Sequence, residues 1–171
     1  YSNCSNMAKK KAKGLEEQKR VDSFLLYMDD KIEKAYQSKV AIVEELIKGM
    51  VDFINNMSPY VLRAWGGNDG LVRGYVESIT RFDEKLHKLK VYSELRDLSA
   101  LMGEWDKFNQ LLKGEIDRLH PGRKEGLEAE RRKISEIAER LLNAIESERG
   151  ILETRKRLLE KDMQILMSEL K

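Results

Sequence analysis

Residues 36–57 read YQSKVAIVEELIKGMVDFINNM. Apolar side chains recur here at alternating spacings of four and three, from Tyr36 through Val40 and Val43 to Met57. This is the heptad period of a coiled-coil helix. Further apolar residues flank this line or its N-terminal extension at Phe24, Ile42, Leu46 and Phe53. A stripe of this width favours packing against at least two neighbouring helices, so the stretch predicts one helix of a bundle.

Two interruptions divide the chain around this stretch. The helical pattern begins near Leu15 and stops at Ser58-Pro59, because proline cannot continue a preceding helix. Residues 60–65 then predict a short helical connector, and GGNDG at 66–70 predicts a loop. A second turn is expected at His120-Pro121-Gly122. The sequence therefore predicts helices over about 15–57, 71–120 and 123–170.

The second of these helices contains a change of register. Its apolar stripe switches sides between Leu89 and Leu98. These two residues are nine positions apart, so they point to opposite sides of a helix, about half a turn from each other. Either the helix breaks near residues 88–93, or its two halves bury against different neighbours. Because no glycine or proline lies there, the sequence favours two halves that bury against different neighbours, with a local bend between them.

Composition supports an all-α fold. Charged residues make up 36% of the 171, and Ala, Glu, Lys, Leu and Arg together make up nearly half. Two prolines and two threonines are too few for the turns and strands of a sandwich or barrel. The prediction is an elongated antiparallel three-helix bundle with coiled-coil character, formed as a single domain by residues 15–171 after a flexible basic tail at 1–14.

The basic tail carries most of the charge imbalance. Residues 1–20 hold six lysines and arginines against two glutamates, and the rest of the chain is slightly acidic. Its cluster is Lys9, Lys10, Lys11 and Lys13. A solubilising terminus is the first interpretation, and a nuclear-import signal or an arm for nucleic acid or anionic lipid is the alternative.

Compartment follows from cysteine usage and hydropathy. The single cysteine, Cys4, cannot form an internal disulfide, and no run of 18 apolar residues occurs. We therefore expect a soluble, intracellular protein of the cytoplasm or nucleus.

The two histidines are the candidates for metal chemistry. Glu84 precedes His87, and Asp117 precedes His120, at the acid-x-x-His spacing that places both side chains on one helical face. Di-iron helical bundles use this spacing on two helices, but here both pairs fall in one predicted helix and His120 abuts a proline. The sequence thus predicts no metal site, no cofactor and no catalytic residue, with a helical metal-binding protein as the second alternative.

The third predicted helix carries the candidate partner-binding residues. Two adjacent apolar lines repeat there every seven residues, as in a two- or three-stranded coiled coil. The residues of these two lines that we predict to bind a partner are Ile137, Ile145, Ile151, Leu152, Leu158, Leu159, Ile165 and Leu166. Charges of both signs interleave around these lines, which argues against a nucleic-acid groove. The basic clusters at 131–133 and 155–157 are candidates for lipid or phosphate contact if they line up on one surface.

One segment is similar to a known protein. The stretch from Ser23-Phe24-Leu25 through Pro59 to Leu62-Arg63 resembles the N-terminal helix of Borealin, a coiled-coil subunit of the chromosomal passenger complex. The similarity covers about a third of the chain and contains no site-specific motif. It implies a class of protein, the coiled-coil assembly subunits, and assigns no residue a role.

The function expected from these observations is non-enzymatic. Three long apolar stripes predict a coiled-coil interaction or scaffold subunit that assembles with itself or with another protein. A BAR-like peripheral membrane module is the first alternative. Nucleic-acid contact is expected only through the tail, and no small-molecule substrate is expected.

Overall fold

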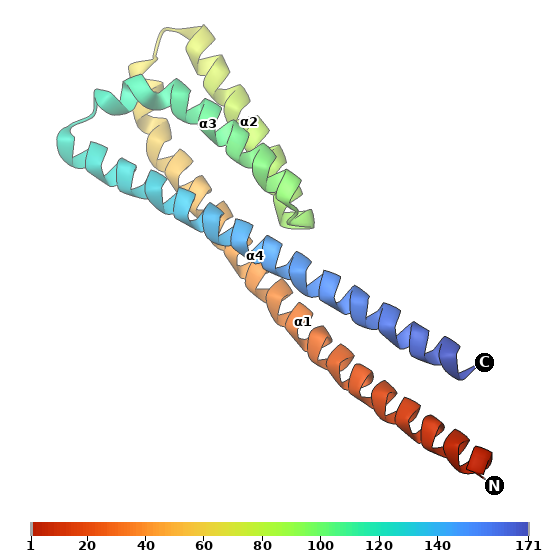
Figure 1. Ribbon diagram of the computed structural model, residues 1–171. Coiled ribbons are helices and arrows are strands. Elements are labelled where there is room, and N and C mark those ends of the chain that lie inside the picture. The colour runs from red at the N-terminus through yellow and green to blue at the C-terminus, as the bar shows by residue number, and fades with distance from the viewer. Residues whose placement is uncertain (1, 171) are drawn as a thin grey trace. The chain divides into compact units, whose positions relative to one another are not determined.

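The computed structural model describes residues 2–170, with side chains from Cys4 onward, and this part of the chain is all α-helical (Figure 1). Its four helices are α1 Ser2–Ala64, α2 Asp69–Tyr92, α3 Leu95–Asp117 and α4 Pro121–Glu169. Long α1 and α4 pack antiparallel. Hydrogen bonds join Gln18 to Asp162, Glu45 to Arg140 and Asn56 to Glu130, so the partner in α4 moves toward its N-terminus as the position in α1 moves toward its C-terminus. The predicted all-α class is confirmed. The predicted number of helices was wrong, because there are four rather than three.

Packing divides the chain into two compact units, where the sequence predicts a single bundle after residue 14. The helix-pair unit contains Tyr1–Gln37 and Glu146–Lys171, and the bundle unit contains Ser38–Ile145. The described part of the predicted tail is helical, because α1 already begins at Ser2. The two units differ in how many helices cover each apolar stripe.

The bundle unit encloses an aromatic core. Trp105 of α3 lies edge-on to Phe53 of α1 with ring centroids 5.0 Å apart, and Phe108 lies edge-on to Phe82 of α2 at 5.1 Å. Edge-to-face pairs of this kind add about 0.5–1.5 kcal/mol beyond the area they bury. The wide stripe on α1 behaves here as predicted: Ile42, Leu46 and Phe53 are all buried.

The predicted break at Ser58-Pro59 was wrong, because α1 continues through Pro59 to Ala64. A proline inside a helix costs about 3 kcal/mol through its missing hydrogen bond and its steric clash. Met57, Val61 and Trp65 follow one another at spacings of four on both sides of the proline, and all three are buried. Burying a large apolar side chain contributes about 1.5–3 kcal/mol, so these three residues offset the cost of Pro59.

The predicted bend near residues 88–93 was also wrong: the chain turns there between two helices. Ser93 takes the left-handed conformation, with φ of 50°. Its backbone N–H donates to the Leu89 carbonyl at 2.8 Å, and its Oγ donates to the same carbonyl at 2.9 Å. These bonds satisfy the end of α2 without a glycine, at a conformational cost of about 1–2 kcal/mol. α2 and α3 therefore form an antiparallel hairpin within the bundle unit (Figure 1).

In the helix-pair unit, the N-terminal part of α1 and the C-terminal part of α4 pack antiparallel. On α1, buried and half-buried positions alternate by four and three through Gln18, Val21, Leu25, Met28 and Ile32. On α4, the corresponding positions are Ile151, Arg155, Leu158, Asp162 and Ile165. The seven-residue repeat of Ile151, Leu158 and Ile165 is the one predicted from the sequence of α4. Polar residues on both strands make this seam thinner than the core of the bundle unit.

Tyr75 gives the bundle unit a sensitivity to high pH. Its side chain is buried, and burial raises the pKa of the phenol above its ordinary value, partly opposed by a 2.5 Å hydrogen bond with Ser58 Oγ. A raised pKa in the folded state means that Tyr75 stabilises the fold fully below about pH 10. This contribution is lost as pH rises through the folded pKa, by at most about 1.4 kcal/mol per pH unit.

We expect the thermal midpoint of Tyr75→Phe to fall less steeply than that of the wild type between about pH 10 and 11.5. Tyr92→Phe is the control, since Tyr92 is exposed at the end of α2. Circular dichroism melts at half-unit pH steps would measure both slopes. Equal slopes for the two variants would contradict the assignment to Tyr75.

Candidate interaction surface

The eight predicted partner-binding residues of α4 fall into three environments. Ile137 and Ile145 are buried in the core of the bundle unit. Ile151, Leu158 and Ile165 are half-buried in the seam with α1. Leu152, Leu159 and Leu166 are 47%, 42% and 43% exposed. The sequence could not separate these sets, because neighbouring heptad lines look alike until the number of covering helices is known.

The three exposed leucines form one line on α4. They are seven residues apart, or two helical turns, so they lie above one another along the same side of the helix. The exposed apolar residues Met163 and Met167 lie in the same part of α4, and exposed Leu170 follows its last residue. We call Leu152, Leu159 and Leu166 the leucine line. Half-exposed leucines repeated at heptad spacing are typical of a helix face that packs against another helix.

Polar pairs set the register of the helix pair on which this line lies. Arg155 Nε donates to Asp29 Oδ1 at 2.5 Å, and Gln18 Nε2 donates to Asp162 Oδ1 at 3.3 Å. Both pairs bridge α1 and α4 within the helix-pair unit. Charged and polar pairs contribute little net stability at a partly exposed seam, but they disfavour shifted registers.

The basic clusters of α4 are partly occupied by internal pairs. Arg155 bonds to Asp29, and Arg131 Nη1 bonds to Glu128 Oε1 at 2.8 Å. One arginine of each cluster proposed for lipid contact is therefore already neutralised by a carboxylate.

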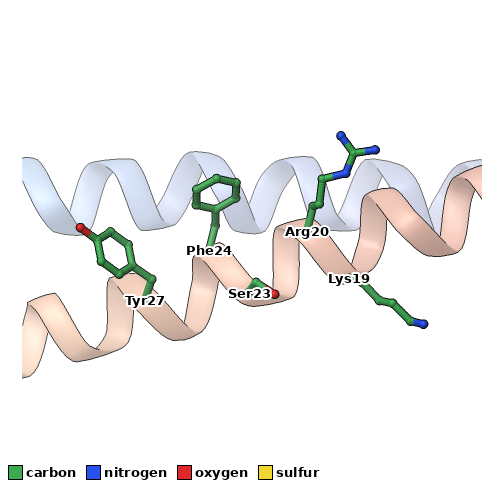
Figure 2. A pocket seen from close by; sticks show the side chains of 5 residues that line it. All are labelled: Lys19, Arg20, Ser23, Phe24 and Tyr27. Atoms are coloured by element: carbon green, nitrogen blue, oxygen red, sulfur yellow. The ribbon is translucent and has the colours of Figure 1, made fainter.

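A groove on α1 was not predicted from the sequence. It is lined by Lys19, Arg20, Ser23, Phe24 and Tyr27, and Figure 2 shows these side chains with α4 behind them. Phe24 widens the predicted apolar stripe, but the described part of the helix-pair unit has no helix besides α1 and α4, and Phe24 is 55% exposed. The signal was present as i, i+4, i+8 spacing of residues 19, 23 and 27, which places them on one side of a helix.

The predicted basic cluster continues into this groove along one helix. Lys9, Lys10, Lys11 and Lys13 are all exposed on α1. Because residues 2–27 are helical without interruption, these lysines are held a few turns from Phe24 and Tyr27.

The candidate metal ligands do not come together. Glu84 and His87 lie on α2 about one and a half turns before its end, whereas Asp117 ends α3 and His120 follows it. Lys124 Nζ pairs with Asp117 Oδ1 at 3.1 Å. Among the described residues, no group of three or more His, Cys, Asp or Glu side chains has the arrangement of a metal site.

Neither a membrane-spanning helix, within the described residues, nor a related protein was found for this chain. None of them between residues 2 and 170 is apolar over a long enough run to cross a bilayer. No family model matches this chain, and no curated protein or solved structure matches it either, so the similarity of residues 23–63 to Borealin stays an expectation from sequence alone.

Proposed function

We propose that this chain is a non-enzymatic coiled-coil interaction or scaffold subunit, which assembles with itself or with another protein through the helix-pair unit. The leucine line is the observation that carries this proposal. Leu152, Leu159 and Leu166 keep the heptad spacing of a helix-packing face, yet each remains more than two-fifths exposed.

The contrast between the two units supports the proposal. In the bundle unit, the wide stripe of α1 is covered from several sides, and Leu46 and Phe53 are fully buried. In the helix-pair unit, Val21 and Leu25 are the only described apolar residues below about a tenth exposed. A two-stranded seam with apolar flanks accepts one or two further helices, as three- and four-stranded coiled coils do.

The size of the leucine line sets the expected strength of assembly. Fully burying a leucine contributes about 1.5–3 kcal/mol, so covering three half-exposed leucines contributes about 3 kcal/mol per copy. Association itself costs several kcal/mol in lost translational and rotational freedom. We therefore expect the neighbouring methionines to be buried as well, and a dissociation constant nearer micromolar than nanomolar.

The proposal is tested by replacing the leucine line with glutamine. Leu152→Gln/Leu159→Gln/Leu166→Gln removes apolar surface at exposed positions and preserves helix propensity. Sedimentation equilibrium from 5 to 100 µM should give the wild type a multiple of the 19.9 kDa monomer mass, and the triple variant the monomer mass. A photo-crosslinking residue at position 159 would report a different protein in the source cell.

Matched exposed apolar residues of the bundle unit provide the control. Leu62→Gln/Leu71→Gln/Val91→Gln removes similarly exposed side chains outside the helix-pair unit and should leave the assembly unchanged. Two results together would refute the proposal. The wild-type chain would stay monomeric up to 100 µM, and every protein crosslinked to it would also be crosslinked to the triple variant.

A further inference from the structure

The groove on α1 is a shallow surface depression that is largely open to solvent. Its volume is about 720 Å³, and all five of its lining residues belong to α1 (Figure 2). Ser23 is the smallest of them and lies one helical turn from both Lys19 and Tyr27. The short serine side chain therefore forms the floor, between longer neighbours on either side.

Two aromatic side chains form the apolar part of the groove. Phe24 is 55% exposed and Tyr27 is 51% exposed, because the seam with α4 is made by Val21, Leu25 and Met28 instead. Aromatic residues with large exposed areas are enriched among the anchors of protein interfaces.

Cations lie near these two rings, together with Asp30, which is one helical turn from Tyr27 and pairs with Lys34. Lys19 and Arg20 line the groove, and within the described residues neither forms an ion pair. Lys31 Nζ lies 4.8 Å from the centre of the Tyr27 ring. Residues 9–20 carry six lysines and arginines against Glu16 and Glu17, a net charge of +4. The groove therefore lies at the end of a locally positive stretch of helix.

Over the whole α1 half of the helix-pair unit, residues 1–37 contain eight basic and six acidic side chains, and the α4 half is neutral. Residues 146–171 contain six acidic and six basic side chains. A flat anionic bilayer would therefore meet carboxylates as well as cations, and its attraction per added lysine is only about 1 kcal/mol. A narrow ligand that follows α1 alone matches the charge distribution better.

We infer that this groove docks an acidic amphipathic helix of a partner protein. An apolar side chain of that helix lies over Ser23 against Phe24 and Tyr27, and flanking carboxylates face Lys19 and Arg20. The groove spans residues 19–27, about 13 Å of helix at 1.5 Å per residue, which matches two turns of a docked helix. The site is separate from the leucine line and depends on the proposed function only in being a protein-docking site.

A peptide-display selection on the full-length chain tests this inference. The library would be 18-residue helical peptides randomised along one face, so that no acidic or apolar pattern is imposed. We expect selected peptides to carry Asp or Glu beside large apolar residues at spacings of three and four. Fluorescence anisotropy should then show at least tenfold weaker binding of a selected peptide to Phe24→Ala/Tyr27→Ala and to Lys19→Glu/Arg20→Glu.

Matched controls come from exposed sites elsewhere. Tyr92→Ala removes an equally exposed aromatic ring, and Lys133→Glu reverses an exposed charge, both in the bundle unit. Both should bind the peptide as the wild type does. Circular dichroism at 222 nm would establish that the groove variants remain helical.

Three results would overturn the inference. Selected peptides that lack acidic residues, or that bind the groove variants with unchanged affinity, would remove the site. If the wild-type chain pellets with phosphatidylserine vesicles and the groove variants do not, the surface would be assigned to lipid. Self-association lost in the groove variants would assign it to a second copy. Peptide binding should survive glutamine at the leucine line, so failure of the proposed function would be seen separately.

Discussion

Leu25→Asp should unfold the helix-pair unit and leave the bundle unit folded. Leu25 is 9% exposed in the seam, so aspartate there loses the apolar contacts of leucine and places a charge next to Val21 and Met28. The combined cost is on the order of 4 kcal/mol. A thin two-stranded seam with polar positions cannot absorb that cost, whereas the larger core of the bundle unit is untouched.

The loss should be visible in two spectra. The helix-pair unit comprises 63 of the 171 residues, 37 from the start of the chain and 26 from its end, so about a third of the ellipticity at 222 nm should disappear. The near-ultraviolet signal of Trp65 and Trp105, both in the bundle unit, should remain. The neighbouring Leu26 is 71% exposed, so Leu26→Asp should change neither spectrum. Equal effects of the two aspartates would contradict the seam described for α1.

Trp105→Ala should produce the largest loss of stability in the bundle unit. The indole is 2% exposed and lies within 6.0 Å of the ring centres of Phe53, Phe82 and Phe108. Truncating a buried tryptophan costs about 3–5 kcal/mol, since the cavity that remains collapses only in part. For a unit of roughly 100 residues this lowers the thermal midpoint by about 15–25 °C.

A melt followed at 222 nm would measure this shift. Trp105→Phe keeps one ring in contact with the three neighbours and should recover more than half of the lost stability. A midpoint within about 3 °C of the wild type for Trp105→Ala would show that this aromatic cluster does not hold the bundle unit together.

Periodicity predicted the helices well where one pattern ran without interruption. Val43 and Met57, both on the line predicted by alternating spacings of four and three, are buried. The burial of Leu46 and Phe53 followed from the width of the stripe. Both results are local in origin, since each depends on residues within a few helical turns.

The errors arose where tertiary packing overrode local preference. Pro59 predicts a helix end, yet buried Val61 and Trp65 keep α1 helical beyond it. Ser93 carries no turn signal, yet two bonds to the Leu89 carbonyl stabilise its left-handed conformation. In both cases the conformation depends on contacts in the folded chain, and the local helix or turn preferences of the residues do not reveal these contacts.

The candidate surfaces show the same division. Spacing identified all eight apolar residues of α4, but it could not say that Leu152, Leu159 and Leu166 remain exposed while Ile137 is buried. The groove around Ser23 was not predicted because its lining residues form no recognisable motif in the sequence. They form a surface because, in the described part of the helix-pair unit, α4 is the one helix beside α1 and leaves Phe24 and Tyr27 about half exposed.

The short turn at Ser93 also has a consequence for the order in which the chain folds. The α2–α3 hairpin closes a connection of two residues, Ser93 and Glu94, whereas the Asp29–Arg155 bond joins positions 126 residues apart. Each doubling of a loop adds about 0.6 kcal/mol to the entropy cost of closing it. We therefore expect the hairpin to form early in folding and the two ends of the chain to pair last.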